Sequence, residues 1–120
     1  MPNAALSLTQ AAIAILRKSL RDPPNTETVA RLIGTSERKL NEAFQEVFSL
    51  SPSKWLQEER ILTARHLLVT TETPVAMISE HLGFANQSNF AKAFRLRFGF
   101  TPSKARAAAR TGAHTGKAFL

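Results

Sequence analysis

An internal repeat with an offset of fifty residues constrains the fold of this chain more than any other feature. Residues 40–54 and 90–104 share four apolar positions, and each segment ends in a Ser/Thr-Pro-Ser-Lys tetrapeptide. The apolar positions are Leu40, Ala43, Phe44 and Phe48 in the first copy and Phe90, Ala93, Phe94 and Phe98 in the second. Upstream the offset is forty-nine, as between Gly34 and Gly83, so the turn of the second copy is one residue longer. Such repetition marks a duplicated supersecondary unit, and we expect two related units.

Residues 73–98 have the pattern of a helix-turn-helix. Thr73 is the expected N-cap of a short helix that has Pro74 at its first position and ends at Gly83. A second helix is expected over residues 86–98, with phenylalanine at every fourth position on one side. Ser88, Lys92 and Arg95 occupy the opposite side. This spacing alone also fits an αα-hairpin with solvated charges, and the repeat and the charge distribution favour the helix-turn-helix.

The same periodicity predicts five further helices, over residues 8–20, 26–33, 37–48, 51–69 and 102–109. Asn25 or Thr26 is expected to cap the second of these five, and Ser36 the third. Trp55 and Met77 are expected to be core residues. The helix over residues 51–69 has two apolar rows, one through Trp55, Leu62 and Val69, which suits a helix that packs against a unit on each side.

The predicted fold class is therefore all-α, with seven helices in two helix-turn-helix units joined by a long linker helix. The expected segments are residues 8–50 for the first unit, 51–69 for the linker helix, 70–109 for the second unit and 110–120 for a flexible tail. A linker helix of about 27 Å, at about 1.5 Å per residue, can hold two recognition helices about one DNA turn apart.

The positive charge is confined to the last third of the chain. Residues 1–80 contain nine basic and nine acidic side chains, whereas residues 81–120 contain seven basic side chains and no acidic one. The formal net charge of +7 is therefore the charge of this last third. Such a distribution points to a polyanionic partner, first nucleic acid and second an anionic membrane surface.

The sequence argues against several other functions. The absence of cysteine excludes disulfides and thiolate metal sites and fits a reducing cytoplasm. His66 and His81 lack partners at ligand spacing, so no metal or other cofactor is expected. No catalytic motif is present, and we expect no enzyme. No apolar run reaches the length of a membrane span, and no signal peptide is recognised, so a cytoplasmic protein without a membrane partner is expected.

Three segments in this order closely resemble the DNA-binding domain of the AraC/XylS family of transcription regulators, over about residues 8–107. They are Arg60-Ile61-Leu62-Thr63-Ala64-Arg65-His66-Leu67-Leu68, then Leu82-Gly83-Phe84 with Gln87, Ser88, Phe90 and Phe94, then Phe98-Gly99 with Thr101, Pro102, Ser103 and Arg106. The resemblance implies an all-helical fold whose two helix-turn-helix units enter successive major grooves of double-stranded DNA. It also implies regulation of transcription, usually activation, through contact with RNA polymerase.

The resemblance also assigns positions that read bases. These are Arg38, Asn41 and Glu42 in the first unit and Gln87, Ser88, Asn89 and Lys92 in the second. Gln45 lies on the same outer side of the first recognition helix, and Arg95 is placed to meet the DNA backbone. Lys92 stands where the family more often has arginine, and it can reach guanine with less bidentate geometry. Glu42 stands where a basic residue is common; an acid repels phosphate but can accept a hydrogen bond from cytosine N4.

Two questions stay open at this level. The family includes short complete regulators and larger proteins with a separate effector-binding domain, and the segment Gly34-Thr35-Ser36 with Arg38-Lys39-Leu40 favours a fragment of the larger kind. An effector-binding domain is accordingly not expected within this chain. The alternative function is a basic helical interaction module that docks an acidic protein or a membrane surface, without dependence on base sequence.

Overall fold

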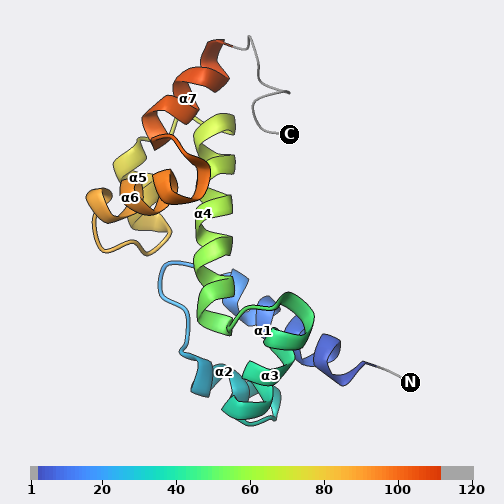
Figure 1. The fold of residues 1–120 in the computed structure, drawn as a ribbon. Coiled ribbons are helices and arrows are strands. Elements are labelled where there is room, and N and C mark those ends of the chain that lie inside the picture. The colour runs from blue at the N-terminus through green and yellow to red at the C-terminus, as the bar shows by residue number, and fades with distance from the viewer. Residues whose placement is uncertain (1–2, 112–120) are drawn as a thin grey trace. The chain divides into compact units, whose positions relative to one another are not determined.

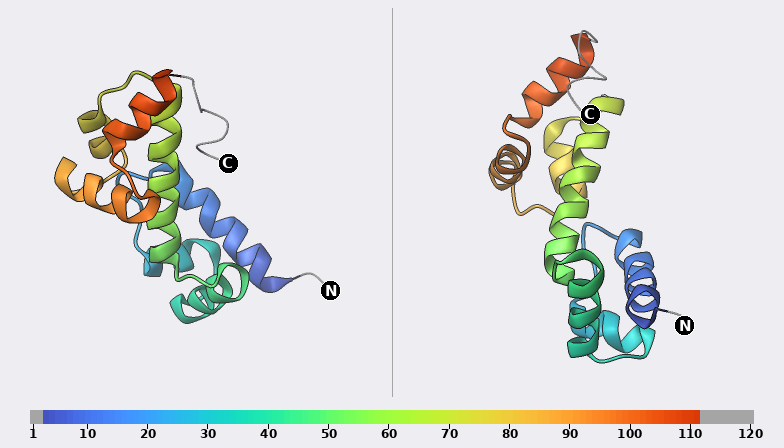
Figure 2. Two further views of the ribbon diagram at one scale, coloured as in Figure 1. Left: turned by 45° about the horizontal axis from the view of Figure 1, so that its top comes forward. Right: turned by 45° about the vertical axis from the view of Figure 1, so that its right-hand side comes forward.

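The computed structural model describes residues 3–111 and contains, within them, seven α-helices and no strand (Figures 1 and 2). The helices are α1 (Ala4–Lys18), α2 (Thr26–Ile33), α3 (Glu37–Phe48), α4 (Pro52–Thr70), α5 (Val75–His81), α6 (Gln87–Phe98) and α7 (Pro102–Thr111). The predicted all-α class with seven helices is confirmed. The chain forms two compact units, residues 1–59 and residues 60–120, and the boundary between them falls within α4.

The first unit has a core made by one side of each of its helices. Fully or almost fully buried residues come from α1 (Ala12, Leu16), α2 (Val29, Ala30), α3 (Leu40, Phe44) and the start of α4 (Trp55). The Phe44 and Trp55 rings meet edge to face at 6.2 Å between centroids, and Phe48 packs against both. The prediction that Trp55 is a core residue is therefore confirmed.

In the second unit, α5, α6 and α7 gather around the C-terminal part of α4 (Figure 1). The buried apolar residues include Ile61, Ala64 and Leu68 of α4, Ile78 of α5, Leu82 just after α5, Phe90 and Phe94 of α6, and Ala105 of α7. Phe94 lies at the centre of a ring cluster, with centroid distances of 5.9 Å to Phe90 and 4.7 Å to Phe98. Phe84 and Phe100, which lie outside the predicted apolar rows, pack against Phe90 and Phe94 respectively.

Most of the predicted helix ends are confirmed. The side chains of Asn25 and Ser36 accept the amide hydrogens of Thr28 and Lys39, so Asn25, rather than Thr26, caps α2. Gly34 and Gly83 follow α2 and α5 with φ of 81° and 87°, a left-handed conformation that glycine adopts without steric cost. The repeat therefore has the same helix, turn and helix in each unit.

Two helix starts differ from the prediction. Helix α1 begins at Ala4 instead of Leu8, because the Asn3 side chain accepts the amide hydrogen of Leu6 and caps the helix there. The predicted capping role of Thr73 is wrong: Pro74 is the N-cap of α5 and makes no side-chain capping bond. The Thr71 hydroxyl accepts the Thr73 amide hydrogen at 3.3 Å, which ties Thr73 into the connection before α5.

Two expected core residues are solvent-exposed. Met77 is 58% exposed, because Ile78, the next residue on the seven-residue helix α5, takes the buried side. Leu62 is 36% exposed, while Ile61 beside it is buried. Helix α7 ends at Thr111, two residues beyond the predicted end, and the rest of the predicted tail lies outside the described residues.

Candidate nucleic-acid interface

The outer side of α6 is held in place from within the second unit. The Asn86 side chain accepts the Asn89 amide hydrogen at 2.7 Å and begins the helix. Phe90 and Phe94 are completely buried and fix one side of the helix on the core. Because a helix turns by about 100° per residue, Ser88, Lys92 and Arg95 then point to solvent, and all three are exposed.

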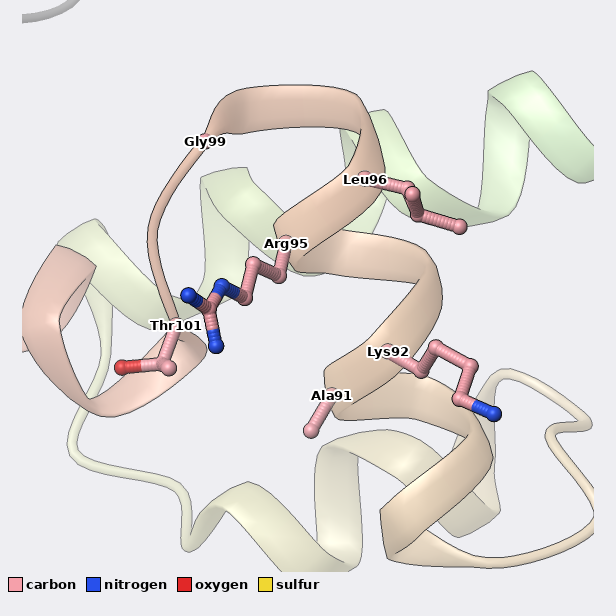
Figure 3. Close-up of a pocket in the computed structure, with 6 residues that line it drawn as sticks. All are labelled: Ala91, Lys92, Arg95, Leu96, Gly99 and Thr101. Carbon is pink, nitrogen blue, oxygen red and sulfur yellow. The ribbon is translucent and has the colours of Figure 1, made fainter.

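A shallow hollow of about 530 Å³ lies along this side of α6 (Figure 3). Its lining residues are Ala91, Lys92, Arg95, Leu96, Gly99 and Thr101. In Figure 3 the Arg95 side chain extends toward Thr101, at the start of α7, while Lys92 leaves the helix in another direction. Gly99, with φ of 87°, turns the chain from α6 toward α7. The hollow is lined by cations, a hydroxyl and apolar groups and contains no acid, which suits an anionic ligand.

The first turn of α6 presents polar side chains. Gln87, Ser88 and Asn89 are all exposed there. Residues at the N-terminal end of a recognition helix are the ones that reach base edges in helix-turn-helix proteins. The structure therefore brings the five positions expected in the second unit, residues 87, 88, 89, 92 and 95, onto one helix with free access to solvent.

Helix α3 places the four positions of the first unit on its outer side, with different chemistry. Arg38, Glu42 and Gln45 are exposed, whereas Asn41 is half-buried. The Asn41 amide group donates to the Glu37 carbonyl oxygen at 3.0 Å. Arg38 Nε lies 4.0 Å from Glu42 Oε1, so a cation and an anion stand side by side on this face.

Two basic side chains of the last third, Arg106 and Arg110, make hydrogen bonds within the second unit. Arg106 is only 8% exposed, and its Nε and Nη2 donate to the carbonyl oxygens of Leu68 and Thr71, each at 3.1 Å. Arg110 Nη2 lies 2.6 Å from Glu72 Oε2. Both belong to the positive charge that the sequence predicts to face a polyanion, but in the structure they hold α7 against the end of α4 and the residues that follow it.

Other arginines of this unit lie against its core. Arg65 and Arg97 stand over the Phe98 ring, with Cζ at 5.0 and 4.9 Å from the ring centroid. Burial lowers the pKa of the Arg60 guanidinium from its ordinary value. The contacts of Arg65 and Arg97 with the Phe98 ring lie at the C-terminal end of α6 and support its position.

Residues 3–111 contain no group of three His, Asp or Glu side chains that could hold a metal ion. Over the same part of the chain, no helix is both long and apolar enough to span a bilayer.

A family model described as a helix-turn-helix domain matches residues 29–108. The virulence regulon transcriptional activator VirF of Yersinia enterocolitica is 40% identical over 77 residues, which are 64% of this chain and 28% of that protein. The transcriptional regulator ArgR of Pseudomonas aeruginosa is 30% identical over 105 residues, or 88% of this chain and 32% of that protein. The chain thus spans about a third or less of these relatives.

Two solved structures are similar over most of their length. An AraC-type DNA-binding transcriptional regulator from Chromobacterium violaceum has a TM-score of 0.83 at 29% identity, with 89% of this chain and 96% of that chain covered. The DNA-binding domain of AdpA, solved in complex with a target DNA, has a TM-score of 0.78 at 28% identity, with 91% and 97% covered.

Proposed function

Because this chain belongs to the AraC/XylS family of transcription regulators and has the fold of its DNA-binding domain, we propose that it binds double-stranded DNA at specific sequences and thereby regulates transcription. The observation that carries this proposal is the outer side of α6, where Lys92 and Arg95 stand exposed on a helix anchored by Phe90 and Phe94. The major groove of DNA admits an α-helix, and its phosphates attract the basic side chains.

Within this proposal the residues have two roles. Gln87, Ser88, Asn89 and Lys92 in the second unit, and Arg38, Asn41, Glu42 and Gln45 in the first, face base edges. Arg95 lies beside Thr101 and contacts the phosphate backbone. Contacts to base edges carry sequence information, whereas contacts to phosphate set affinity and position.

The segments act together on one duplex. Residues 8–50 and 70–109 each supply a helix-turn-helix and are joined by the linker over residues 51–69, and we expect their recognition helices to enter major grooves about one turn of DNA apart. The proposal has four further parts: the protein contacts RNA polymerase, it usually activates transcription, it lies in the cytoplasm, and it catalyses no reaction. Support comes from relatives named as transcriptional activators.

Selection of bound duplexes from a random pool, followed by titration across salt concentrations, tests this function. We expect an enriched sequence and an affinity that falls steeply with salt, with a log–log slope of about −0.9 for each phosphate contacted. A basic module that docks acidic proteins or membranes would enrich no sequence. Affinity that stays constant between low and physiological salt would contradict DNA binding.

A further inference from the structure

The two recognition helices carry opposite charges at equivalent positions. Glu42 stands two residues after the buried Leu40 and two before the buried Phe44, and Lys92 stands in the same way between Phe90 and Phe94. The helices α3 and α6 both have twelve residues and both begin at a side-chain N-cap. Glu42 and Lys92 are both exposed to solvent.

The surroundings of Glu42 reinforce this difference. Helix α3 contains three acidic and two basic residues, whereas α6 contains three basic residues and no acidic one. Asn41 donates one of its two amide hydrogens to the Glu37 carbonyl, so one hydrogen and the side-chain oxygen are left for a ligand. At the one equivalent position, α3 therefore offers a hydrogen-bond acceptor, the Glu42 carboxylate, where α6 offers a donor, the Lys92 ammonium group.

An ionised carboxylate only accepts hydrogen bonds. In the major groove it is repelled by phosphate and by the O6 and N7 acceptors of guanine. Of the two base donors there, the cytosine 4-amino group suits it better than the adenine 6-amino group, which lies beside the N7 acceptor. We propose that Glu42 is a specificity-determining residue that accepts a hydrogen bond from a cytosine 4-amino group in the half-site of the first unit. This proposal rests on the DNA-binding function proposed above and gives its two half-sites opposite hydrogen-bonding polarity.

A purely structural role for Glu42 is the competing explanation. Its pair with Arg38 is long, at 4.0 Å, and the two side chains are 64% and 88% exposed. Pairs of this kind contribute little to stability in water. Removal of the Glu42 carboxylate therefore leaves the fold intact, and its effect on DNA binding can be measured on folded protein.

The test uses the whole chain and its selected duplex. Each cytosine of the first half-site is replaced in turn by an analogue that lacks only the 4-amino group. At one position we expect the wild type to lose about tenfold in affinity, the size of one base-edge contact. Glu42→Ala binds the two duplexes equally well. Glu46→Ala, the matched control, removes an exposed acid one turn further along α3 and keeps the tenfold loss.

Either of two results overturns the inference. If Glu42→Ala still loses tenfold with the analogue, another residue reads the amino group. If no cytosine of the half-site matters to the wild type, Glu42 accepts no hydrogen bond from a cytosine amino group. A wild type that enriches no duplex at all would instead remove the proposed function itself, so the two failures are distinguishable.

Discussion

Replacing Arg106 with methionine should destabilise the second unit by about 2–4 kcal/mol. The buried guanidinium donates to the Leu68 and Thr71 carbonyl oxygens, at the end of α4 where no helical amide reaches them. Two hydrogen bonds from a charged donor contribute about 3–6 kcal/mol. Methionine fills a similar volume and avoids the cost of burying a charge, so the net loss of stability is smaller than these hydrogen bonds alone would suggest. Arg106→Lys should be intermediate, since lysine lacks the planar fork.

Urea unfolding with two probes measures this effect. Far-UV circular dichroism reports on the helices of both units, whereas the chain's single tryptophan, Trp55, lies in the core of the first unit. Arg106→Met should therefore shift the circular dichroism midpoint more than the fluorescence midpoint. Arg110→Met is the matched control: its pair with Glu72 is exposed on both sides, and its loss should cost less than about 1 kcal/mol. Equal stability of Arg106→Met and wild type would refute the reasoning.

Three other substitutions separate base reading, phosphate contact and folding in the second unit. Lys92→Ala should cost about 1–3 kcal/mol of binding free energy on the selected duplex and relax the preference at one or two base pairs, while Arg95→Ala should weaken binding to all duplexes about equally. The ratio of specific to non-specific affinity distinguishes the two roles. An unchanged ratio for Lys92→Ala would mean that Lys92 contacts phosphate and not a base. Phe94→Ala should destabilise the second unit by about 3–5 kcal/mol, because it removes a completely buried ring, and a folded Phe94→Ala with altered sequence preference would contradict that structural role.

The repeat and the helix ends were accessible from the sequence because they depend on local chemistry. Asn25 and Ser36 cap helices through their own side chains, and Gly34 and Gly83 adopt the left-handed conformation that glycine favours. Apolar spacing of three and four residues also placed Phe90 and Phe94 in the core. These signals lie within a few residues of the feature that they predict.

Features that depend on distant neighbours were not accessible in this way. Methionine is apolar, so Met77 is expected in the core. The short helix α5 buries only one of its sides, however, and Ile78 lies on that side. The contacts of Arg106 join residues 35 and 38 positions apart, and no local pattern distinguishes Arg106 from an arginine that faces DNA. The sequence marks Arg106 as special in one way: it lies in the segment from Phe98 to Arg106, which resembles the AraC/XylS family.

The candidate site shows the same division. Periodicity predicted that Ser88, Lys92 and Arg95 share the outer side of α6, and all three are exposed. The sequence does not predict the hydrogen bond from the Asn41 side chain to the Glu37 carbonyl or the hollow bounded by Thr101. Both are visible only in the folded chain. Which of these side chains contact bases stays a prediction, because contact with DNA depends on a partner that the sequence does not contain.

Footprinting on the selected duplex, before and after insertion of 5 base pairs between its half-sites, tests the central claim most directly. We expect one chain to protect two major-groove segments about 10 base pairs apart, the spacing of one helical turn. The insertion turns one half-site to the opposite face of the duplex, so protection of both segments by one chain should be lost. If both segments stay protected with unchanged affinity after the insertion, the two helix-turn-helix units of one chain do not bind the two half-sites at a fixed spacing. That result would contradict the central claim.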